Sequence, residues 1–161
     1  MEYKLSVVII TLNEEKNIER CLSSVKEIAD DIVVVDSYSS DKTEALCNKA
    51  GVRFFQHPWT GYSEQKNYAN SLAMFDWIFS LDADEALSDE LKESILRAKK
   101  DFKTTDFRIC RITNYCGKWI RHSGWYPDIK TRLFNRTLHH WEGMIHERLN
   151  FHNETAIPVL K

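Results

Sequence analysis

The chain of 161 residues lacks several features by which protein classes are identified from sequence alone. No apolar stretch approaches the roughly 20 residues that a membrane-spanning helix needs. Neither G-x-G-x-x-G nor G-x-x-x-x-G-K-S/T occurs, which excludes a dinucleotide fingerprint and a P-loop. Repeats and low-complexity tracts are also absent. With 43% hydrophobic and 29% charged residues, the composition predicts one compact globular domain with a substantial core.

Cysteine is present, but without the spacing of a metal site. The four residues show no C-x-x-C pattern and fall within segments that are predicted as helix or strand: Cys21, Cys47, Cys110 and Cys116. We therefore expect reduced, mostly packed thiols in a cytosolic protein. The first residues lead directly into a predicted strand without a signal-peptide pattern, so the expected location is the cytoplasm.

Strand and helix patterns alternate over residues 1–106. Continuous apolar runs predict buried strands of a parallel sheet over residues 5–10, 32–35, 52–56 and 77–81. Amphipathic segments after these strands predict four helices, which begin at Asn13, at Ser40 or Asp41, at Ser63 and at Ser88. The helix that begins at Ser40 or Asp41 should end at Gly51.

Helix patterns largely stop after Asp106. Strands are predicted over residues 107–115, 130–135 and 141–149, and an aromatic loop over 117–128. The expected fold class is α/β, with a mostly parallel sheet flanked by helices and antiparallel strands in the C-terminal third. Acidic residues outnumber basic ones up to residue 107, and basic residues outnumber acidic ones after it. The shift predicts two functional halves within one domain, unless it is plain surface variation.

The most informative segment is the acidic sequence Asp82-Ala83-Asp84-Glu85, which directly follows the apolar run 77–81. Alternate residues of an extended chain point the same way, so Asp82 and Asp84 can converge on one ligand. A hard cation, Mg²⁺ or Mn²⁺, would relieve the repulsion between these carboxylates. The alternative is a solvated turn in which Asp84 or Glu85 begins the next helix.

Two other predicted strands end in polar residues as well, at 11–14 and at 36–39. Open parallel sheets bind ligands at the carboxyl ends of their strands, so three polar ends in register predict a cleft. An acidic residue after the second strand can accept hydrogen bonds from a base or a ribose. A metal held at Asp84 could meet a pyrophosphate. Together these features describe a nucleoside diphosphate that lies across the edge of the sheet.

Four blocks of the sequence resemble a known family. They read S-V-V-I-I-T-L-N-E-E-x-N-I, D-x-I-V-V-V-D-S-x-S-x-D-x-T, G-Y-S-E-Q-K-N-x-A and W-I-F-S-L-D-A-D-E. Their order and spacing resemble the family 2 nucleotide-sugar glycosyltransferases, which have the GT-A (Rossmann-like) fold. The later blocks G-W-Y-P-D-x-x-x-R-L-F-N-R and W-x-G-x-I-H-E resemble a bacterial subgroup that includes lipopolysaccharide core glucosyltransferases.

The resemblance implies roles for residues of the first half. It implies nucleotide contacts by Thr11, Asn13, Glu14, Asp36, Lys66 and Asp82. Asp36 would contact the base, Asp82 would bind the ribose or assist the metal, and Asp84 would ligate it. Lys66 would lie near the nucleotide, although a solvated helix lysine is the alternative. The cation would act as a Lewis acid on the departing diphosphate, and Glu85 is expected only to lead into the next helix.

An inverting transfer also needs a general base for the acceptor hydroxyl. Glu147 is the preferred candidate because it lies in the W-E-G-M-I-H-E block, and Asp128 in the aromatic loop is the second. The chain lacks the E-D pair that many relatives use. His146 is either a further metal ligand or a structural histidine.

Other residues of the second half leave two interpretations open. Arg132 and Arg136 either contact the diphosphate or form the solvent face of an edge strand. Trp119, Trp125 and Trp141 could stack on sugar rings. The alternative is that they are core residues or loop anchors, which is more common for tryptophan.

We therefore expect a metal-dependent inverting glycosyltransferase that moves a sugar from a nucleotide sugar, with UDP-sugar favoured, to a glycan or glycolipid acceptor. Residues 1–106 would form the nucleotide-sugar half and 107–161 the acceptor side. The alternatives are a nucleotidyltransferase or pyrophosphorylase and a non-catalytic sugar-nucleotide-binding module. Nucleic acid is disfavoured because an acidic cleft repels it. The resemblance also implies a truncated chain that lacks a tail for peripheral contact with the inner face of the membrane.

Overall fold

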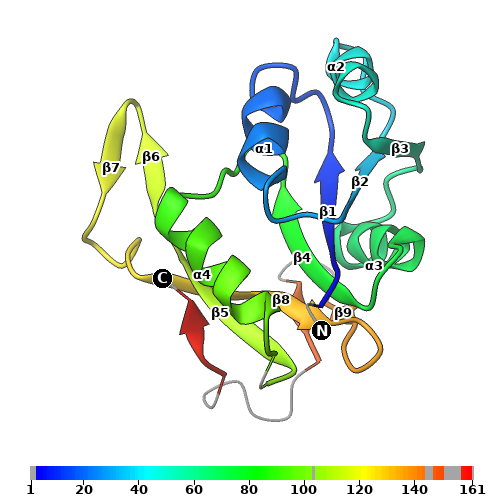
Figure 1. The fold of residues 1–161 in the computed structure, drawn as a ribbon. Coiled ribbons are helices and arrows are strands. Elements are labelled where there is room, and N and C mark those ends of the chain that lie inside the picture. The colour runs from blue at the N-terminus through cyan, green and yellow to red at the C-terminus, as the bar shows by residue number, and fades with distance from the viewer. Residues whose placement is uncertain (1–2, 103, 144–146, 151–156, 161) are drawn as a thin grey trace.

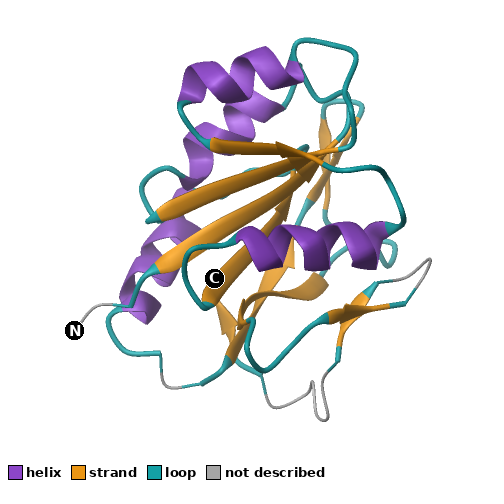
Figure 2. Ribbon diagram, turned by 90° about the vertical axis from the view of Figure 1, so that its right-hand side faces the viewer, coloured by secondary structure: helices purple, strands orange, loops and turns teal. Residues whose placement is uncertain are grey.

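The computed structural model describes residues 3–102, 104–143, 147–150 and 157–160. Its centre is a seven-stranded sheet in the order β11-β5-β8-β4-β1-β2-β3. The strands of this sheet are β1 (Leu5–Thr11), β2 (Asp31–Asp36), β3 (Arg53–Gln56), β4 (Trp77–Asp82), β5 (Asp106–Arg111), β8 (Asp128–Asn135) and β11 (Val159–Leu160). Helices lie on both sides of these strands (Figure 2).

The first four strands form the parallel part of the sheet. β1 is central and pairs in parallel with β2 on one side and with β4 on the other, while β3 extends the sheet beyond β2. Every residue of β1 is buried, as its unbroken apolar run predicts for a strand covered on both faces. In Figure 1, β1 and β4 point the same way. Their carboxyl ends therefore share one edge.

The antiparallel part of the sheet is made by β8, which lies between β4 and β5. Because β8 runs against both neighbours, β5 runs parallel to β4. β5 therefore ends, and β8 begins, at the edge where β1 and β4 end. We call this edge the carboxyl edge.

The helices cover the two faces of the sheet unequally. One core cluster joins the sheet to α1 (Ile18–Val25), α2 (Thr43–Ala50) and α4 (Asp89–Lys99) through buried residues such as Cys21, Cys47 and Ile95. The other cluster joins it to α3 (Tyr62–Leu72), β9 (Trp141–Glu142) and β10 (Arg148–Leu149). The predicted α/β class with antiparallel strands late in the chain is confirmed.

Two helix ends follow the predicted capping. Ser88 accepts a hydrogen bond from the backbone N–H of Leu91 at 3.2 Å, which is an N-cap contact for α4. Gly51 ends α2 with φ 72°, in the left-handed region that favours glycine. The predicted opening of α1 at Asn13 is wrong, because Asn13 has φ 54° and the helix begins at Ile18.

The C-terminal third corrects three further expectations. The strand predicted over 107–115 divides into β5 and β6 (Thr113–Tyr115). The predicted loop contains β7 (Lys118–Ile120), which pairs with β6 in a two-stranded hairpin. The strand predicted over 141–149 is instead two short strands, β9 and β10, which pair antiparallel.

Two expectations from the composition concern the burial of the cysteines and the absence of a membrane-spanning helix. Cys21 and Cys47 are buried free thiols as predicted, but Cys116 is exposed at the turn between β6 and β7. Within the described residues, no helix is both long enough and apolar enough to cross a bilayer.

Candidate functional site

The carboxyl edge brings the three predicted polar strand ends together. Thr11 lies opposite Asp36 in the pairing of β1 with β2, and Ile10 lies opposite Asp82 in the pairing of β1 with β4. The sheet order therefore places Thr11, Asp36 and Asp82 on three adjacent strands. This is the juxtaposition that a ligand-binding edge of an open parallel sheet requires.

Asp36 organises the loops at the ends of β1 and β2. Its carboxylate is fully buried and accepts hydrogen bonds from the backbone N–H of Ser39, at 2.7 Å, and from the hydroxyl of Ser39. The same hydroxyl oxygen accepts from the N–H of Asn13, and the side-chain oxygen of Asn13 accepts from the N–H of Ser40 at 2.8 Å. The two loops are thus fastened to each other. Thr11 beside them is buried.

Glu14 is positioned by the helices that follow these loops. Its N–H donates to the hydroxyl of Thr43 at 2.9 Å, and its carboxylate accepts from the side-chain amide of Asn17 at 2.7 Å. The left-handed backbone of Asn13 turns the chain so that Glu14 follows directly at the edge.

Asp82, at the end of β4, lies between two buried cations. Arg132 donates to Oδ2 of Asp82 at 2.8 Å, and Nζ of Lys66 lies 3.2 Å from Oδ1. Lys66 is 1% exposed and Arg132 is 4% exposed. Burial alone would raise the pKa of Asp82, but the charges of Arg132 and Lys66 outweigh it and lower the pKa to about 2. Asp82 is therefore ionised at neutral pH.

Lys66 is a buried cation and not a solvated helix lysine. Besides Asp82 it contacts Oε1 of Glu147 at 2.9 Å, and its ammonium lies 4.8 Å from the centroid of the Trp141 ring. Lys66 holds the pKa of Glu147 below its usual range, although burial opposes this shift. Glu147, the preferred candidate base, is thus brought to the same site as Asp82.

Glu85 has a larger role than the helix lead expected of it. Its Oε2 accepts a hydrogen bond from the backbone N–H of Asp82 at 3.0 Å. Its Oε1 accepts from Arg111 at 2.8 Å and from Arg132 at 3.3 Å. Glu85 therefore closes residues 82–85, which we call the acidic turn, and joins that turn to β5 and β8.

Asp128, the second candidate base, is also tied to this cluster. Its Oδ2 accepts from Nε of Arg111 at 2.9 Å and from Nη2 at 2.5 Å. Contacts between opposite charges consequently run without a break through seven residues, which we call the ion-pair chain: Glu147, Lys66, Asp82, Arg132, Glu85, Arg111 and Asp128.

Asp84 differs from the other carboxylates of the acidic turn. Its side chain has no ion-pair partner among the described residues, while its backbone carbonyl accepts from Arg20 at 2.6 Å. Burial and the nearby carboxylates of Glu85, Asp82 and Glu14 raise the pKa of Asp84. Negative charge at this position is therefore the least compensated in the turn.

The described residues do not show the predicted metal site. In the part of the chain that the structure describes, no three His, Cys, Asp or Glu side chains are grouped closely enough to hold a metal ion. Mg²⁺, however, is usually bound by one or two carboxylates together with substrate phosphates and water. The uncompensated Asp84 fits that kind of site. His146 lies outside the described residues.

Sequence reasoning missed Arg111 and understated Arg132. Arg111 ends β5 at the carboxyl edge, but the strand prediction ran on to residue 115 and concealed that end. Arg132 is buried and forms ion pairs with Asp82 and Glu85 of the acidic turn, so it is not part of a solvent face. Arg136 lies beyond the other end of β8, where it donates to the carbonyl of Asn70 at 2.7 Å.

The tryptophans separate into two groups. Trp141 is a core residue that packs edge-on against Phe134, whereas Trp119 and Trp125 are exposed. Of the three tryptophans predicted to stack on sugar rings, Trp119 and Trp125 are therefore accessible to a sugar and Trp141 is not.

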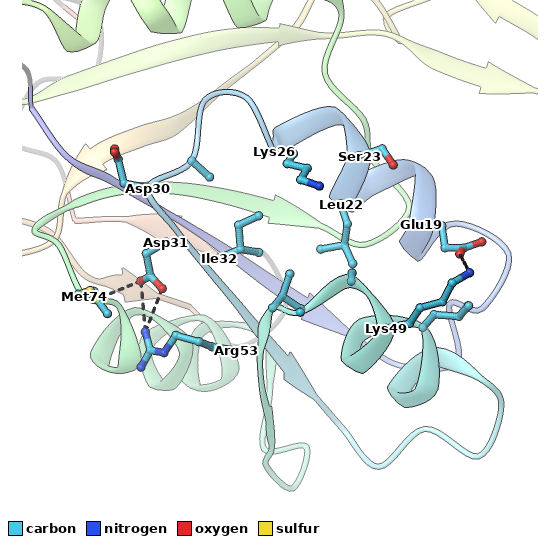
Figure 3. Close-up of a pocket in the computed structure, with 15 residues that line it drawn as sticks. Glu19, Leu22, Ser23, Lys26, Asp30, Asp31, Ile32, Lys49, Arg53 and Met74 are labelled. Carbon is cyan, nitrogen blue, oxygen red and sulfur yellow. Dashed lines mark hydrogen bonds and ion pairs between the residues drawn. The ribbon is translucent and has the colours of Figure 1, made fainter.

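A pocket of about 560 Å³ lies away from this site, between α1, α2 and the amino ends of β2 and β3. Asp31 in it is held by Arg53 and by the backbone N–H of Met74, and Lys49 pairs with Glu19 at its rim (Figure 3). None of the predicted site residues lines it. A smaller pocket, of about 270 Å³, borders Asp128 together with Thr113, Gly124, Trp125 and Pro127.

A mainly parallel sheet with helices on both faces, and with polar residues gathered at its carboxyl edge, is the arrangement of a nucleotide-binding α/β protein. The family model of glycosyl transferase family 2 matches residues 6–152. The chain therefore belongs to glycosyltransferase family 2.

Two curated relatives are similar in sequence. An uncharacterized glycosyltransferase of Rickettsia bellii is 48% identical over 92 residues, which are 57% of this chain and 31% of that protein. The lipopolysaccharide core biosynthesis glycosyltransferase LpsC of Rhizobium meliloti is 44% identical over 94 residues, 55% of this chain and 34% of that protein. The aligned part of this chain thus spans about a third of the length of these relatives.

Solved structures with the same fold are more distant in sequence. TarS 1-349 of S. aureus in complex with UDP-GlcNAc has a TM-score of 0.62 at 20% identity, over 84% of this chain and 46% of that one. Glucosyl-3-phosphoglycerate synthase of Mycobacterium tuberculosis, in complex with Mn²⁺, UDP and glucosyl-3-phosphoglycerate, has a TM-score of 0.55 at 20% identity, over 67% of this chain and 43% of that one.

Proposed function

We propose that this chain transfers a sugar from a nucleoside diphosphate sugar to an acceptor hydroxyl, with inversion at the anomeric carbon. The observation that carries the proposal is the carboxyl edge, where the unpaired Asp84 stands beside the cation-clamped Asp82. Membership of glycosyltransferase family 2 gives the reaction class. UDP is the favoured nucleotide because two proteins of similar fold bind UDP or UDP-GlcNAc.

The donor would lie across the ends of β1, β2 and β4. In this proposal the loop that Asp36 fastens to Asn13 forms the wall for the base and ribose. Asp82 faces the ribose, held in place by Lys66 and Arg132, and Thr11, Glu14 and Lys66 complete the pocket. The clamped position of Asp82 leaves Asp84 as the carboxylate available to a cation.

A divalent cation, Mg²⁺ or Mn²⁺, fits this edge through Asp84. Burial and the nearby carboxylates of Glu85, Asp82 and Glu14 raise the pKa of Asp84, and a cation would stabilise its charged form. A structure of similar fold contains Mn²⁺ together with UDP. When bound, the cation would supply Lewis-acid stabilisation of the leaving diphosphate. His146 remains a second candidate ligand.

Glu147 is the proposed general base. A base must be deprotonated before it can accept a proton, and the contact with Lys66 keeps Glu147 ionised at neutral pH. Only Oε1 is held by Lys66. Oε2 would take the proton of the acceptor hydroxyl as its oxygen attacks the anomeric carbon opposite the diphosphate. Asp128, beside the smaller pocket, is the alternative base.

The acceptor would be a glycan or glycolipid bound by residues 107–161. The name of the LpsC relative supports lipopolysaccharide synthesis as the setting. A cytoplasmic protein at the inner face of the membrane fits that setting. A nucleotidyltransferase is less well supported because the first strand ends in Thr11 to Glu14 and not in a glycine-rich basic loop.

Donor binding is tested by thermal unfolding with UDP-, GDP-, CDP- and dTDP-sugars, each with and without Mn²⁺. A ligand at about 100 times its Kd stabilises the folded state by about 2.7 kcal/mol. We expect a UDP-sugar to raise the Tm most, and more with Mn²⁺ than without it.

Asp84→Ala should abolish the Mn²⁺-dependent part of this shift, while Glu93→Ala, on the exposed face of α4, should keep it. If Asp84→Ala responds to Mn²⁺ as the unaltered protein does, Asp84 is not the ligand.

Base assignment is tested by Glu147→Gln and Asp128→Asn, assayed by metal-dependent hydrolysis or transfer of the UDP-sugar. Removing a general base costs roughly 100- to 10,000-fold in kcat. We expect this loss for transfer by Glu147→Gln, with the Kd of the UDP-sugar unchanged within about a factor of five. If only Asp128→Asn shows this loss of kcat, Asp128 is the base and Glu147 is not.

A further inference from the structure

The β6–β7 hairpin and the segment after it lie on the acceptor side of the proposed site but contribute no residue to the ion-pair chain. We define residues 113–127 as the aromatic hairpin. Its two strands pair only with each other, so the hairpin is not part of the central sheet. It stands out from the body of the molecule beyond α4 (Figure 1). Every residue from Thr113 to Trp119 is exposed.

Large aromatic side chains on this hairpin face solvent. Tyr115 is 61% exposed, Trp119 57% and Trp125 50%. The rings of Tyr115 and Trp125 meet edge-on with centroids 6.0 Å apart. Tyr115 pairs with Lys118 and Trp119 with Asn114, so Tyr115 and Trp119 lie on opposite faces of the ribbon. Tyr115 and Trp125 thus form one exposed ring pair, and Trp119 adds an exposed ring on the other face. Large aromatic side chains left exposed together on one hairpin indicate an interaction site.

The same segment carries positive charge without compensation. No Asp or Glu occurs between Arg111 and Asp128. Lys118 and Arg121 are both exposed. Neither forms an ion pair with another residue of the described part of the chain. The aromatic rings are therefore interleaved with free cations, and the hairpin has the electrostatic sign to attract an anionic surface.

We propose that the aromatic hairpin is a membrane-docking surface that binds the anionic headgroups of a lipid bilayer. Trp and Tyr favour the interface between headgroups and acyl chains, where the ring is apolar and its N–H or O–H reaches water. Lys and Arg beside them are attracted to anionic lipids. A neutral glycan could stack on the aromatic rings but would offer no negative charge to Lys118 and Arg121. An anionic bilayer can bind both the rings and the two cations.

The placement of the hairpin has a consequence for the acceptor. β6 follows the end of β5, which lies at the carboxyl edge with the acidic turn. Docking through the hairpin would hold this edge near the bilayer, where a glycolipid hydroxyl is presented. This consequence rests on the proposed function, but docking itself does not depend on transferase activity and is tested without it.

The test is co-sedimentation of the chain with vesicles of phosphatidylcholine, with and without phosphatidylglycerol. We expect binding to the vesicles that contain phosphatidylglycerol, and weaker binding as salt is raised. Each cation near an anionic surface is worth roughly a factor of five, so Lys118→Ala with Arg121→Ala should weaken partitioning roughly 25-fold. Trp119→Ala should also reduce the bound fraction severalfold.

Controls separate docking from misfolding and from general stickiness. Trp59→Ala and Lys100→Ala alter an exposed aromatic and an exposed cation elsewhere, and both variants should bind as the unaltered protein does. All variants should keep the same Tm, because the altered side chains are exposed.

Three results would overturn the proposal. The first is a chain that stays in the supernatant with anionic vesicles, and the second is hairpin variants that bind as well as the controls. The third is a hairpin that binds only a soluble oligosaccharide, or only a second copy of the chain, with either interaction lost in Trp119→Ala.

Discussion

At the scale of single residues, each carboxylate of the acidic turn has its own electrostatic environment. Asp82 lies between Arg132 and Lys66, Glu85 contacts Arg111 and Arg132, and Asp84 has no cation beside its carboxylate in the described structure. The pKa of Asp82 is consequently lowered and that of Asp84 is raised. The three acidic residues of the turn therefore differ in role: Asp82 is held by two cations, Glu85 braces the turn, and Asp84 is the proposed ligand of a cation.

Glu85→Ala should damage both stability and donor binding. It removes the partner of the Asp82 N–H and one partner each of Arg111 and Arg132. Leaving such groups unpaired costs about 2 kcal/mol. We expect that loss in urea unfolding, together with a weaker Mn²⁺-dependent shift by the UDP-sugar. Glu85→Gln should recover part of both.

Glu93→Ala is the matched control for Glu85→Ala. Glu93 forms only an exposed pair with Arg97, worth about 0.5 kcal/mol at most. If the two alanine variants lose equal stability and bind the donor equally well, Glu85 does not brace the turn.

Asp82 should make the free energy of unfolding fall at acid pH. Its pKa is about 2 in the folded state and 3.8 as a reference value for the unfolded chain. The unfolded state therefore binds more protons between these values, and the contribution of Asp82 to stability is complete above about pH 5 and is lost as pH falls through about 2. The shift corresponds to about 2 kcal/mol.

The measurement is urea unfolding of the unaltered protein and of Asp82→Asn across this pH range. The difference in unfolding free energy should be constant at pH 5 and above and should shrink by about 2 kcal/mol towards pH 2. A difference that does not change with pH would mean that Asp82 is not clamped as an ion in the folded state.

At the scale of elements, the helices and strands were predicted most accurately where a run of neighbouring residues carries the signal. The strands β1, β2 and β4 follow from continuous apolar runs. The end of α2 follows from Gly51, and the start of α4 follows from Ser88. The predictions were least accurate in the C-terminal third. There β6 and β7 are exposed strands that lack the apolar run of a buried strand, so hydrophobicity did not separate β6 from β5 and did not distinguish β7 from a loop.

At the scale of the whole molecule, the two proposed halves share one sheet. β8, from the second half, pairs with β4, from the first, and carries Arg132 to Asp82. The ion-pair chain crosses the same boundary through Lys66 and Glu147. Residues 1–106 and 107–161 can therefore differ in function, but they are not separate structural units.

A single cooperative unfolding transition is expected from this shared sheet. Tryptophans report on both halves, with Trp77 in β4 and Trp141 in β9. Tryptophan fluorescence and far-ultraviolet circular dichroism should give coincident urea midpoints. Midpoints that are clearly separated would show that the halves unfold independently.

The sequence by itself determined the family, the buried strands and the acidic turn, because each is written in neighbouring residues. It also placed Thr11, Asp36 and Asp82 at strand ends, and a parallel sheet then brings those ends together. Only the tertiary structure decided how their charges are balanced. The contacts of the ion-pair chain join residues that are up to 81 positions apart. Arg132 and Arg111 reach the acidic turn because β8 lies between β4 and β5, and Lys66 meets Glu147 because β9 and β10 pack in one cluster with α3. Both arrangements follow from the packing of the whole chain and not from a local pattern.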